Sequence, residues 1–187
     1  MAITTAVPSV KSARVYDISG ERSASFAKSV GADLGIAITP AETPAEALKD
    51  VDIIVTATTS PDPIVTAKDV TKGCFYAHIG GNECTFDVVQ KADKIVVDDW
   101  AQITHRGGDT LSTMYFQGLI GDDDLYARID ELVTGEKVGR ESDDEIIYCN
   151  SVGLALYDLA LAKRIFDTAR ENGIGRPLPL WEDPIWV

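Results

Sequence analysis

The chain has 187 residues, of which 45% are hydrophobic and 25% are charged, and its formal net charge is -13 with a pI near 4.4. This length suffices for one full domain with a buried core and a small appendage, and the composition is that of a globular protein. Nucleic acid and anionic membranes repel so negative a protein, so neither is expected as a partner.

Cysteine usage and hydropathy indicate the compartment. The three cysteines, Cys74, Cys84 and Cys149, are odd in number and form no CxxC pair. We expect reduced thiols that pack as small buried hydrophobes. No signal peptide is visible, and no apolar run approaches the roughly 18 to 20 residues that a membrane helix requires. The sequence therefore predicts a cytoplasmic protein.

The longest acidic cluster, GDDD at residues 121–124, predicts a solvated helix start rather than a metal site. Acidic side chains favour the positive end of a helix dipole, and no His or second acidic cluster lies at a useful spacing. No metal is predicted.

The first half of the chain alternates short apolar strands with short helices. Residues 1–10 indicate the tail of a helix, and strands are predicted over residues 13–16, 35–38, 52–57, 75–79 and 94–97. Helices are predicted from the Ser19 cap to Val30 with Gly31 as the stop, from the Thr43 cap to Asp50, as a single turn after Thr66, and over residues 86–91. This alternation is typical of the βαβ units of a parallel sheet.

From Trp100 onward helices dominate. They are predicted over residues 100–105, 110–117 and 123–133, followed by a strand over 145–149 and the longest helix over 151–172. The tail, residues 173–187, contains prolines and two tryptophans without a regular period.

The stretch FYAHIGGNE at residues 75–83 is the first candidate for a site. A buried strand runs into Gly80 and Gly81, which let the backbone turn and approach a ligand without an intervening Cβ. In open α/β sheets, ligands bind at the carboxyl edge of the strands. We therefore expect this stretch to form one wall of a site.

Six ordered motifs carry a resemblance to a known family. They are VYD at 15–17, VTATTS at 55–60, HIGGN at 78–82, VVDD at 96–99, GRESDDEI at 139–146 and NSVGLALYDLA at 150–160. With them the chain resembles the nucleotide-binding part of the ornithine cyclodeaminase/mu-crystallin family. The resemblance implies an α/β fold with a Rossmann-like parallel sheet flanked by helices. It also implies binding of NAD, with NADP possible, and chemistry on the carbon–nitrogen bond of a small amino or imino acid.

The resemblance also implies a set of cofactor-binding residues, namely Asp17, Thr58, His78, Ile79, Gly80, Gly81, Asn150 and Ser151. Asp17 at a strand end would accept hydrogen bonds from the adenosine ribose and favour NAD over NADP, although alone it would be interpreted as a turn residue. Thr58 would line the adenine and ribose side, or its hydroxyl would serve its own backbone.

The remaining positions also have two interpretations. His78 is a proton donor or a satisfied structural histidine. Asn150 and Ser151 lie at the predicted start of the long helix, where free N–H groups suit a polar or anionic ligand group, but either residue would also serve as a plain N-cap. For Gly80 and Gly81, a tight turn and a nicotinamide wall require the same geometry.

Two departures from the family pattern matter. Cyclodeaminases carry an Asp directly after the two glycines as the acid/base, so the resemblance assigns Asn82, which stands there in this chain, to the catalytic position. An amide cannot take a proton, so ornithine cyclodeamination through Asn82 is not expected, and Glu83 is a candidate substitute. A dehydrogenase or reductase is therefore the better expectation.

The second departure concerns the N-terminal part of the proteins in this family. The sequence contains no Gly-x-Gly-x-x-Gly turn, and it lacks the half that in relatives supplies the substrate-holding lysine and arginine and builds the dimer. A Rossmann sheet without its first strand has two unpaired edges. We therefore expect a fragment: a truncated Rossmann-type domain over 1–150, and over 151–187 a long helix and tail that pack on the missing domain or a partner.

Two functions stay open. One is a fragment of an NAD(P)-dependent oxidoreductase, similar to an alanine dehydrogenase or a ketimine reductase and inactive as an isolated chain. The other is a non-catalytic, mu-crystallin-like module that binds a nucleotide or a protein. Asp17 and the glycine pair favour the first function, whereas Asn82 and the missing loop favour the second. A homodimer is expected, with Trp181 and Trp186 as candidates for its interface.

Overall fold

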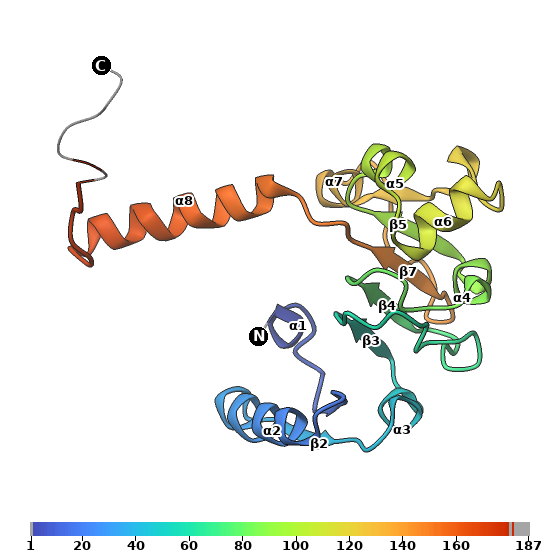
Figure 1. Ribbon diagram of the computed structural model, residues 1–187, viewed down its shortest axis with the longest axis horizontal. Coiled ribbons are helices and arrows are strands. Elements are labelled where there is room, and N and C mark those ends of the chain that lie inside the picture. The colour runs from blue at the N-terminus through green and yellow to red at the C-terminus, as the bar shows by residue number, and fades with distance from the viewer. Residues whose placement is uncertain (1, 180, 182–187) are drawn as a thin grey trace. The chain divides into compact units, whose positions relative to one another are not determined.

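The computed structural model describes residues 2–179 and 181 (Figure 1). Its contacts divide the chain into two units, Met1–Val152 and Gly153–Val187. The first unit holds two parallel sheets with their connecting helices, and the second consists of one helix and the segment after it. No helix among the described residues has both the length and the apolar character needed to cross a membrane.

The larger sheet has five parallel strands in the order β3-β4-β7-β5-β6. The bounds are β3 (Ile53–Thr56), β4 (Phe75–His78), β7 (Ile147–Asn150), β5 (Lys94–Val97) and β6 (Ala127–Arg128). The last strand in the chain, β7, lies between β4 and β5, and Cys149 pairs with Ala77 on one side and Val96 on the other. The predicted α/β fold with a parallel sheet is confirmed. Because the strands are parallel, their carboxyl ends meet at one edge.

A second parallel sheet is formed by β1 (Ser12–Val15) and β2 (Ala37–Pro40). Among the described strands, β1 pairs only with β2, and β3 pairs only with β4. Each of the two strands therefore has one edge without a strand partner. That the sheet lacks a first strand stays a prediction.

The helices of the first unit are short, and side chains cap several of them. They are α1 (Ala2–Ala6), α2 (Gly20–Leu34), α3 (Pro44–Leu48), α4 (Phe86–Lys91), α5 (Trp100–Arg106), α6 (Thr110–Phe116) and α7 (Ile129–Thr134). The predicted caps are confirmed, because the side chain of Ser19 accepts from the Arg22 N–H and that of Thr43 accepts from the Glu46 N–H.

The core contains both tyrosines of the central strands. Tyr76 on β4 and Tyr148 on β7 are buried, and their ring centroids lie 5.5 Å apart in an edge-on arrangement. Cys74 and Cys84 are also buried, and Cys149 is half-buried. Desolvation raises the pKa of each of the three thiols to about 11, so they are protonated and pack as small hydrophobes, as predicted.

The stop predicted at Gly31 is wrong. Helix α2 runs on to Leu34, and Gly35 ends it with a φ of 67° and an N–H donated to the Gly31 carbonyl. The next strand consequently begins at Ala37 instead of residue 35. The single helical turn predicted after Thr66 is a turn in which the Asp69 carboxylate accepts from the Thr66 N–H and hydroxyl.

The helix predicted over residues 123–133 is also wrong. Its place is taken by the 3-10 helix η1 (Asp122–Asp124), strand β6 and helix α7. Ala127 is 1% exposed and pairs with Val96, so burial against β5 extends this segment as an edge strand. Within the described residues, no three His, Cys, Asp or Glu side chains are grouped to hold a metal ion.

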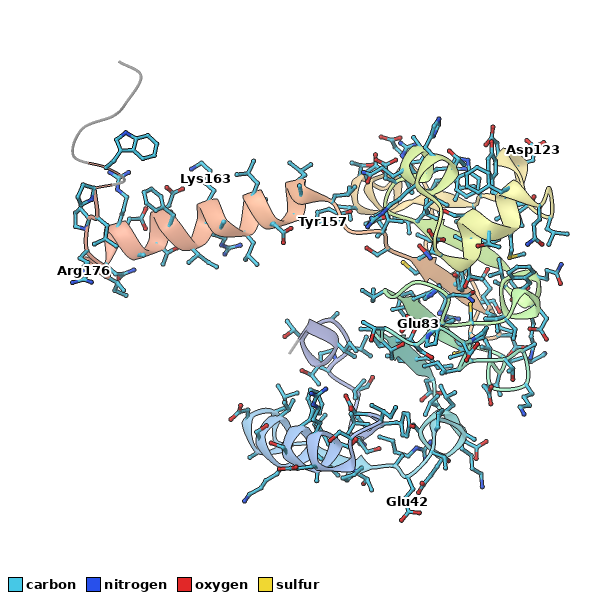
Figure 2. All side chains as sticks on the ribbon, viewed as in Figure 1. Glu42, Glu83, Asp123, Tyr157, Lys163 and Arg176 are labelled. Atoms are coloured by element: carbon cyan, nitrogen blue, oxygen red, sulfur yellow. The ribbon has the colours of Figure 1, made fainter. Side chains whose placement is uncertain are left out.

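The second unit contains α8 (Ala155–Glu171), which has no buried residue. Figure 2 shows its side chains projecting all around the helix, among them the labelled Tyr157 and Lys163. Its exposed large apolar side chains are Leu156, Tyr157, Leu159, Leu161, Ile165 and Phe166. Trp181 is 49% exposed, and Trp186 lies outside the described residues. Packing of this helix on a further domain or partner stays a prediction.

Candidate functional site

A pocket of about 400 Å³ lies at the carboxyl edge of the five-stranded sheet, and we call it the edge pocket. It is lined by residues after β4, residues at and after β7, and the loop between α5 and α6. These residues are Ile79, Gly80, Gly81, Asn150, Ser151, Val152, Arg106, Gly107, Gly108 and Asp109. The structure therefore brings together five of the predicted cofactor residues: Ile79, Gly80, Gly81, Asn150 and Ser151.

The loop at Gly81 packs directly against a second glycine pair. A Cβ on Gly81 would lie 2.9 Å from the Gly108 carbonyl oxygen, and the Thr110 N–H donates to the Gly81 carbonyl at 3.3 Å. Gly107 and Gly108 have φ values of 72° and 92°, a region that favours glycine. Sequence reasoning missed this second pair, although a glycine pair before the capping Asp109 was a usable signal.

Asp98 fixes the segment that leaves β7. This residue follows β5, is 6% exposed, and accepts from the Ser151 hydroxyl at 2.7 Å and from the Val152 N–H at 3.1 Å. Gly153 has a φ of 77°, and α8 begins only at Ala155. The prediction that Asn150 and Ser151 lie at the start of the long helix is therefore wrong. They reach the pocket from the end of strand β7 and not from the first turn of α8.

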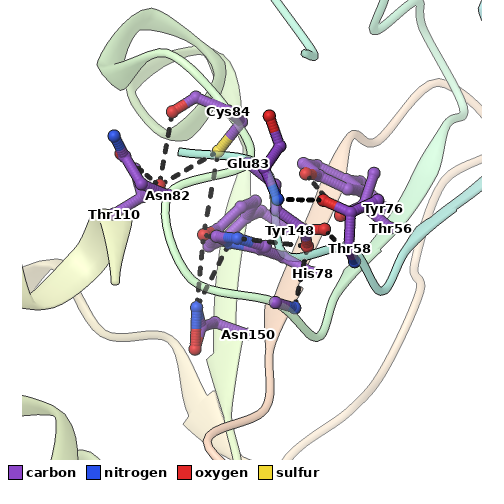
Figure 3. A network of polar contacts seen from close by, with 12 residues as sticks. Thr56, Thr58, Tyr76, His78, Asn82, Glu83, Cys84, Thr110, Tyr148 and Asn150 are labelled. Atoms are coloured by element: carbon purple, nitrogen blue, oxygen red, sulfur yellow. Dashed lines mark hydrogen bonds and ion pairs between the residues drawn. The ribbon is translucent and has the colours of Figure 1, made fainter. Parts of the chain in front are cut away.

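Glu83 points into the protein and is fully buried. One carboxylate oxygen accepts from the Thr58 N–H and the other accepts from the Gly80 N–H at 2.7 Å (Figure 3). Burial alone would raise the pKa of Glu83, but hydrogen bonds from Thr56, Thr58 and Gly80 outweigh burial and lower the pKa. Glu83 is thus a fixed anion held by backbone and side-chain donors, which makes it a poor replacement for the missing acid/base.

His78 lies beside Glu83 with its ring completely buried. Its Nδ1 lies 2.5 Å from the Tyr148 hydroxyl oxygen, and its Nε2 has no hydrogen-bond partner among the described residues. Burial lowers the pKa of His78 against the raising effect of Glu83 and Asp109, so the ring is neutral. The geometry favours a structural histidine, and a contact of His78 with the cofactor stays a prediction.

Asn82 does not line the edge pocket. It borders a second hollow of about 440 Å³ together with Pro63, Cys84, Thr85, Phe86, Asp87 and Thr113. The Thr110 hydroxyl donates to the Asn82 side-chain oxygen at 3.5 Å. A polar but non-ionisable group therefore stands at the position where the resemblance expects an acid, and its catalytic assignment stays a prediction.

Asp17 and Thr58 both make local contacts. Asp17 follows β1 in the smaller sheet, where its side chain accepts from the Ser19 N–H at 2.8 Å and its N–H donates to Ser23. The Thr58 hydroxyl accepts from the Ser60 N–H at 3.2 Å. These are the bonds of turn residues. Contacts of either residue with an adenosine group stay a prediction.

Comparison of the sequence with known proteins gives a consistent result. Residues 1–173 match the ornithine cyclodeaminase/mu-crystallin family. An alanine dehydrogenase from Archaeoglobus fulgidus is 39% identical over 137 residues, which is 71% of this chain and 42% of that protein. A Delta(1)-pyrroline-2-carboxylate reductase from Bacillus cereus is 31% identical over 175 residues, 91% of this chain and 53% of that protein. The chain thus spans about half the length of these curated relatives.

Solved structures give the same result for the fold. Delta(1)-pyrroline-2-carboxylate reductase from Thermococcus litoralis, in complex with NADH and L-proline, matches with a TM-score of 0.83 and 33% identity over 90% of this chain and 53% of that chain. An archaeal alanine dehydrogenase dimer with bound NAD matches with a TM-score of 0.80 and 33% identity, covering 92% of this chain and 53% of that one.

Proposed function

The chain belongs to the ornithine cyclodeaminase/mu-crystallin family, and on this premise we propose that it is the nucleotide-binding part of an NAD(P)-dependent oxidoreductase. Its substrate would be a small amino or imino acid. The observation that carries the proposal is the edge pocket, a glycine-walled hollow where open α/β sheets bind ligands. The match to a reductase that holds NADH and L-proline supports it.

The residues of the edge pocket fit the nicotinamide half of a dinucleotide. Gly80 and Gly81 present backbone without a side chain, and Ile79 is 48% exposed and offers an apolar surface to a ring. Ser151, oriented by Asp98, offers a polar contact. When bound, the nicotinamide would supply or accept the hydride, and these residues would orient the ring and keep water from one of its faces.

The polar groups near the pocket favour a dehydrogenase or reductase over a cyclodeaminase. Asn82 cannot accept a proton, and Glu83 is an anion engaged by two backbone N–H groups. We therefore propose a reaction similar to that of an alanine dehydrogenase or a ketimine reductase, with hydride transfer between the nicotinamide and the α-carbon of the substrate.

Three finer points belong to the same proposal. Asp17 supports NAD over NADP, because a carboxylate near the ribose would repel a 2′-phosphate. A homodimer is supported by the archaeal alanine dehydrogenase dimer and by the exposed apolar side chains of α8. A cytoplasmic location of the protein is supported by its three free cysteines.

Titration of NADH and NADPH into the full chain, followed by nucleotide fluorescence, tests the proposal. We expect NADH to bind, and we expect Gly81→Val to weaken binding by at least about tenfold, or about 1.4 kcal/mol. Gly139→Val is the matched control, because a Cβ on Gly139 meets no atom within 4 Å. The assignment would be refuted if neither NADH nor NADPH binds, or if Gly81→Val and Gly139→Val bind NADH equally well.

A second candidate is a non-catalytic module that binds a nucleotide or a protein. The observation in its favour is that the described site offers no free carboxylate at Asn82 or Glu83. Because the isolated chain is expected to be inactive, turnover is measured in a fusion that joins it to the remaining half of the related alanine dehydrogenase. Incubation of this fusion with NAD and L-alanine or L-proline, and with NADH and the corresponding imino acids, separates the two. Nucleotide binding without any turnover would favour the module.

A further inference from the structure

Glu83 joins two loops that leave neighbouring strands. Thr58 follows β3 and Gly80 follows β4, and the N–H groups of both residues donate to the same buried carboxylate (Figure 3). Strands β3 and β4 are paired in register up to Thr56 and His78, just before these loops diverge. One side chain therefore sets the distance between the loops and the direction of both N–H groups.

The charge of Glu83 is compensated by the N–H groups of Thr58 and Gly80 and by threonine side chains, and not by a cation. Within the described residues, its only ion-pair geometry is with His78, whose Nε2 lies 3.6 Å away and whose ring is neutral. Hydrogen bonds from backbone N–H groups to a carboxylate are short and strong when water is excluded. A carboxylate provides two acceptors and no donor, which matches two inward-pointing N–H groups. A glutamine would place an N–H group against one of them.

The contact between Glu83 and the Gly80 N–H requires a residue without a side chain at position 80. A Cβ on Gly80 would overlap the Glu83 carboxyl group, whereas a Cβ on Gly81 would meet the Gly108 carbonyl oxygen. The two glycines of the motif thus have different roles in the structure. The first admits the carboxylate beneath the loop, and the second admits the neighbouring glycine loop.

We propose that Glu83 is a positioning residue that holds the Thr58 loop and the Gly80 loop in the arrangement that binds the dinucleotide. The inference rests on the proposed function, since Thr58 is predicted to lie on the adenosine side of the cofactor and Gly80 on the nicotinamide side. Glu83 does not contact the cofactor. It acts through the two backbone segments that it joins.

The first test needs no nucleotide. Amide hydrogen exchange and amide shifts of Thr58 and Gly80 are measured by NMR in the wild-type chain, in Glu83→Gln and in the control Glu141→Gln, which removes a carboxylate bound to Lys94. We expect exchange at both amides to rise at least about tenfold in Glu83→Gln only, with β5 and β7 amides unchanged. In the wild type, both amide shifts should titrate together in acid. Unchanged exchange in Glu83→Gln would overturn the proposal.

The second test measures the NADH dissociation constant of the same proteins below their melting temperatures. Glu83→Gln and the shorter Glu83→Asp are expected to weaken NADH binding at least about tenfold, or about 1.4 kcal/mol, whereas Glu141→Gln leaves it unchanged. If Glu83→Gln fails to fold, both tests are made with Glu83→Asp instead. A lower melting temperature with an unchanged dissociation constant would make Glu83 merely structural and overturn the positioning role.

The two tests separate the failure of this inference from that of the proposed function. If the wild-type chain binds no NADH, the cofactor assignment fails, and the positioning role fails with it. The exchange of the Thr58 and Gly80 amides then still decides whether Glu83 joins the two loops. If the wild-type chain binds NADH and Glu83→Gln binds it equally well, only the role of Glu83 is refuted.

Discussion

The imidazole Nε2 of His78 lies 3.6 Å from a carboxylate oxygen of Glu83, and both side chains are completely buried. Burial lowers the pKa of His78, whereas hydrogen bonds from Thr56, Thr58 and Gly80 outweigh burial and lower the pKa of Glu83. The pair therefore consists of a neutral ring beside a carboxylate and is not a salt bridge at neutral pH. Its protonation behaviour leads directly to a prediction about acid stability.

The free energy of unfolding is expected to fall as the pH drops below about 6.5. The pKa of His78 is lower in the folded chain than its ordinary value of 6.5, so the unfolded chain binds the proton more readily. The lowered pKa of Glu83 adds a further loss below its ordinary value of 4.5. Each group contributes a slope of up to about 1.4 kcal/mol per pH unit. Urea unfolding between pH 8 and pH 4 measures this dependence.

His78→Gln is expected to remove the part of the pH dependence that begins near pH 6.5. His105 is the only other histidine in the sequence and is exposed, so His105→Gln is the matched control. The same slope in wild type and His78→Gln would show that His78 is not the titrating group.

Tyr148→Phe is expected to destabilise the fold by about 1–3 kcal/mol. The change removes the hydroxyl 2.5 Å from His78 Nδ1 and leaves this buried nitrogen only its longer contact with the Asn150 side-chain nitrogen at 3.3 Å. Tyr126→Phe is the control, since that hydroxyl bonds the Val138 carbonyl at an exposed position. Denaturant unfolding of both variants gives the comparison, and equal losses would contradict the importance of the buried network.

Gly80→Ala is expected to cost about 1–3 kcal/mol, because its Cβ would overlap the Glu83 carboxyl group. In a Glu83→Ala background the same change should cost less, with a coupling energy of about 0.5–3 kcal/mol. Gly139→Ala, in open space, should change the unfolding free energy by less than about 0.5 kcal/mol. Additive losses in the double-mutant cycle would argue against the contact.

Asp98→Ala is expected to release the segment after β7 and lower stability by about 1.5–3 kcal/mol, because the Ser151 hydroxyl and the Val152 N–H lose a charged acceptor. NADH binding should weaken as well. Asp99→Ala, which removes the cap of α5 instead, should lower stability by about 1 kcal/mol and leave NADH binding unchanged. Denaturant unfolding and fluorescence titration of both variants test this distinction.

Features of the fold that depend on local pattern could be predicted from the sequence. The apolar runs that became β3, β4 and β5 and the caps at Ser19 and Thr43 carry their own signals. Strand β6 could not be predicted, because Ala127 is extended by pairing with Val96, more than 30 residues earlier in the chain. The late start of α8 likewise depends on Asp98, which reaches Ser151 from another strand.

The candidate site was predictable to a similar extent. Gly80 and Gly81 could be identified because a glycine pair directly after a buried strand indicates a tight turn or a close approach of the backbone to another group. The inward orientation of Glu83 was not predictable, since it depends on where the loop of Thr58 runs. Gly107 and Gly108 form a glycine pair that the sequence displays, but their approach to Gly81 is a contact between distant segments and was not predictable.

The position of β7 in the sheet has a consequence for how the chain folds during synthesis. Strands β4 and β5 are close in sequence, but they are joined only through β7, which the ribosome delivers some 50 residues later. Until then, a nascent chain has two incomplete half-sheets with unpaired inner edges, the kind of intermediate that chaperones bind. A chain truncated before β7 would therefore be prone to aggregate, whereas a chain truncated within α8 would contain all five strands.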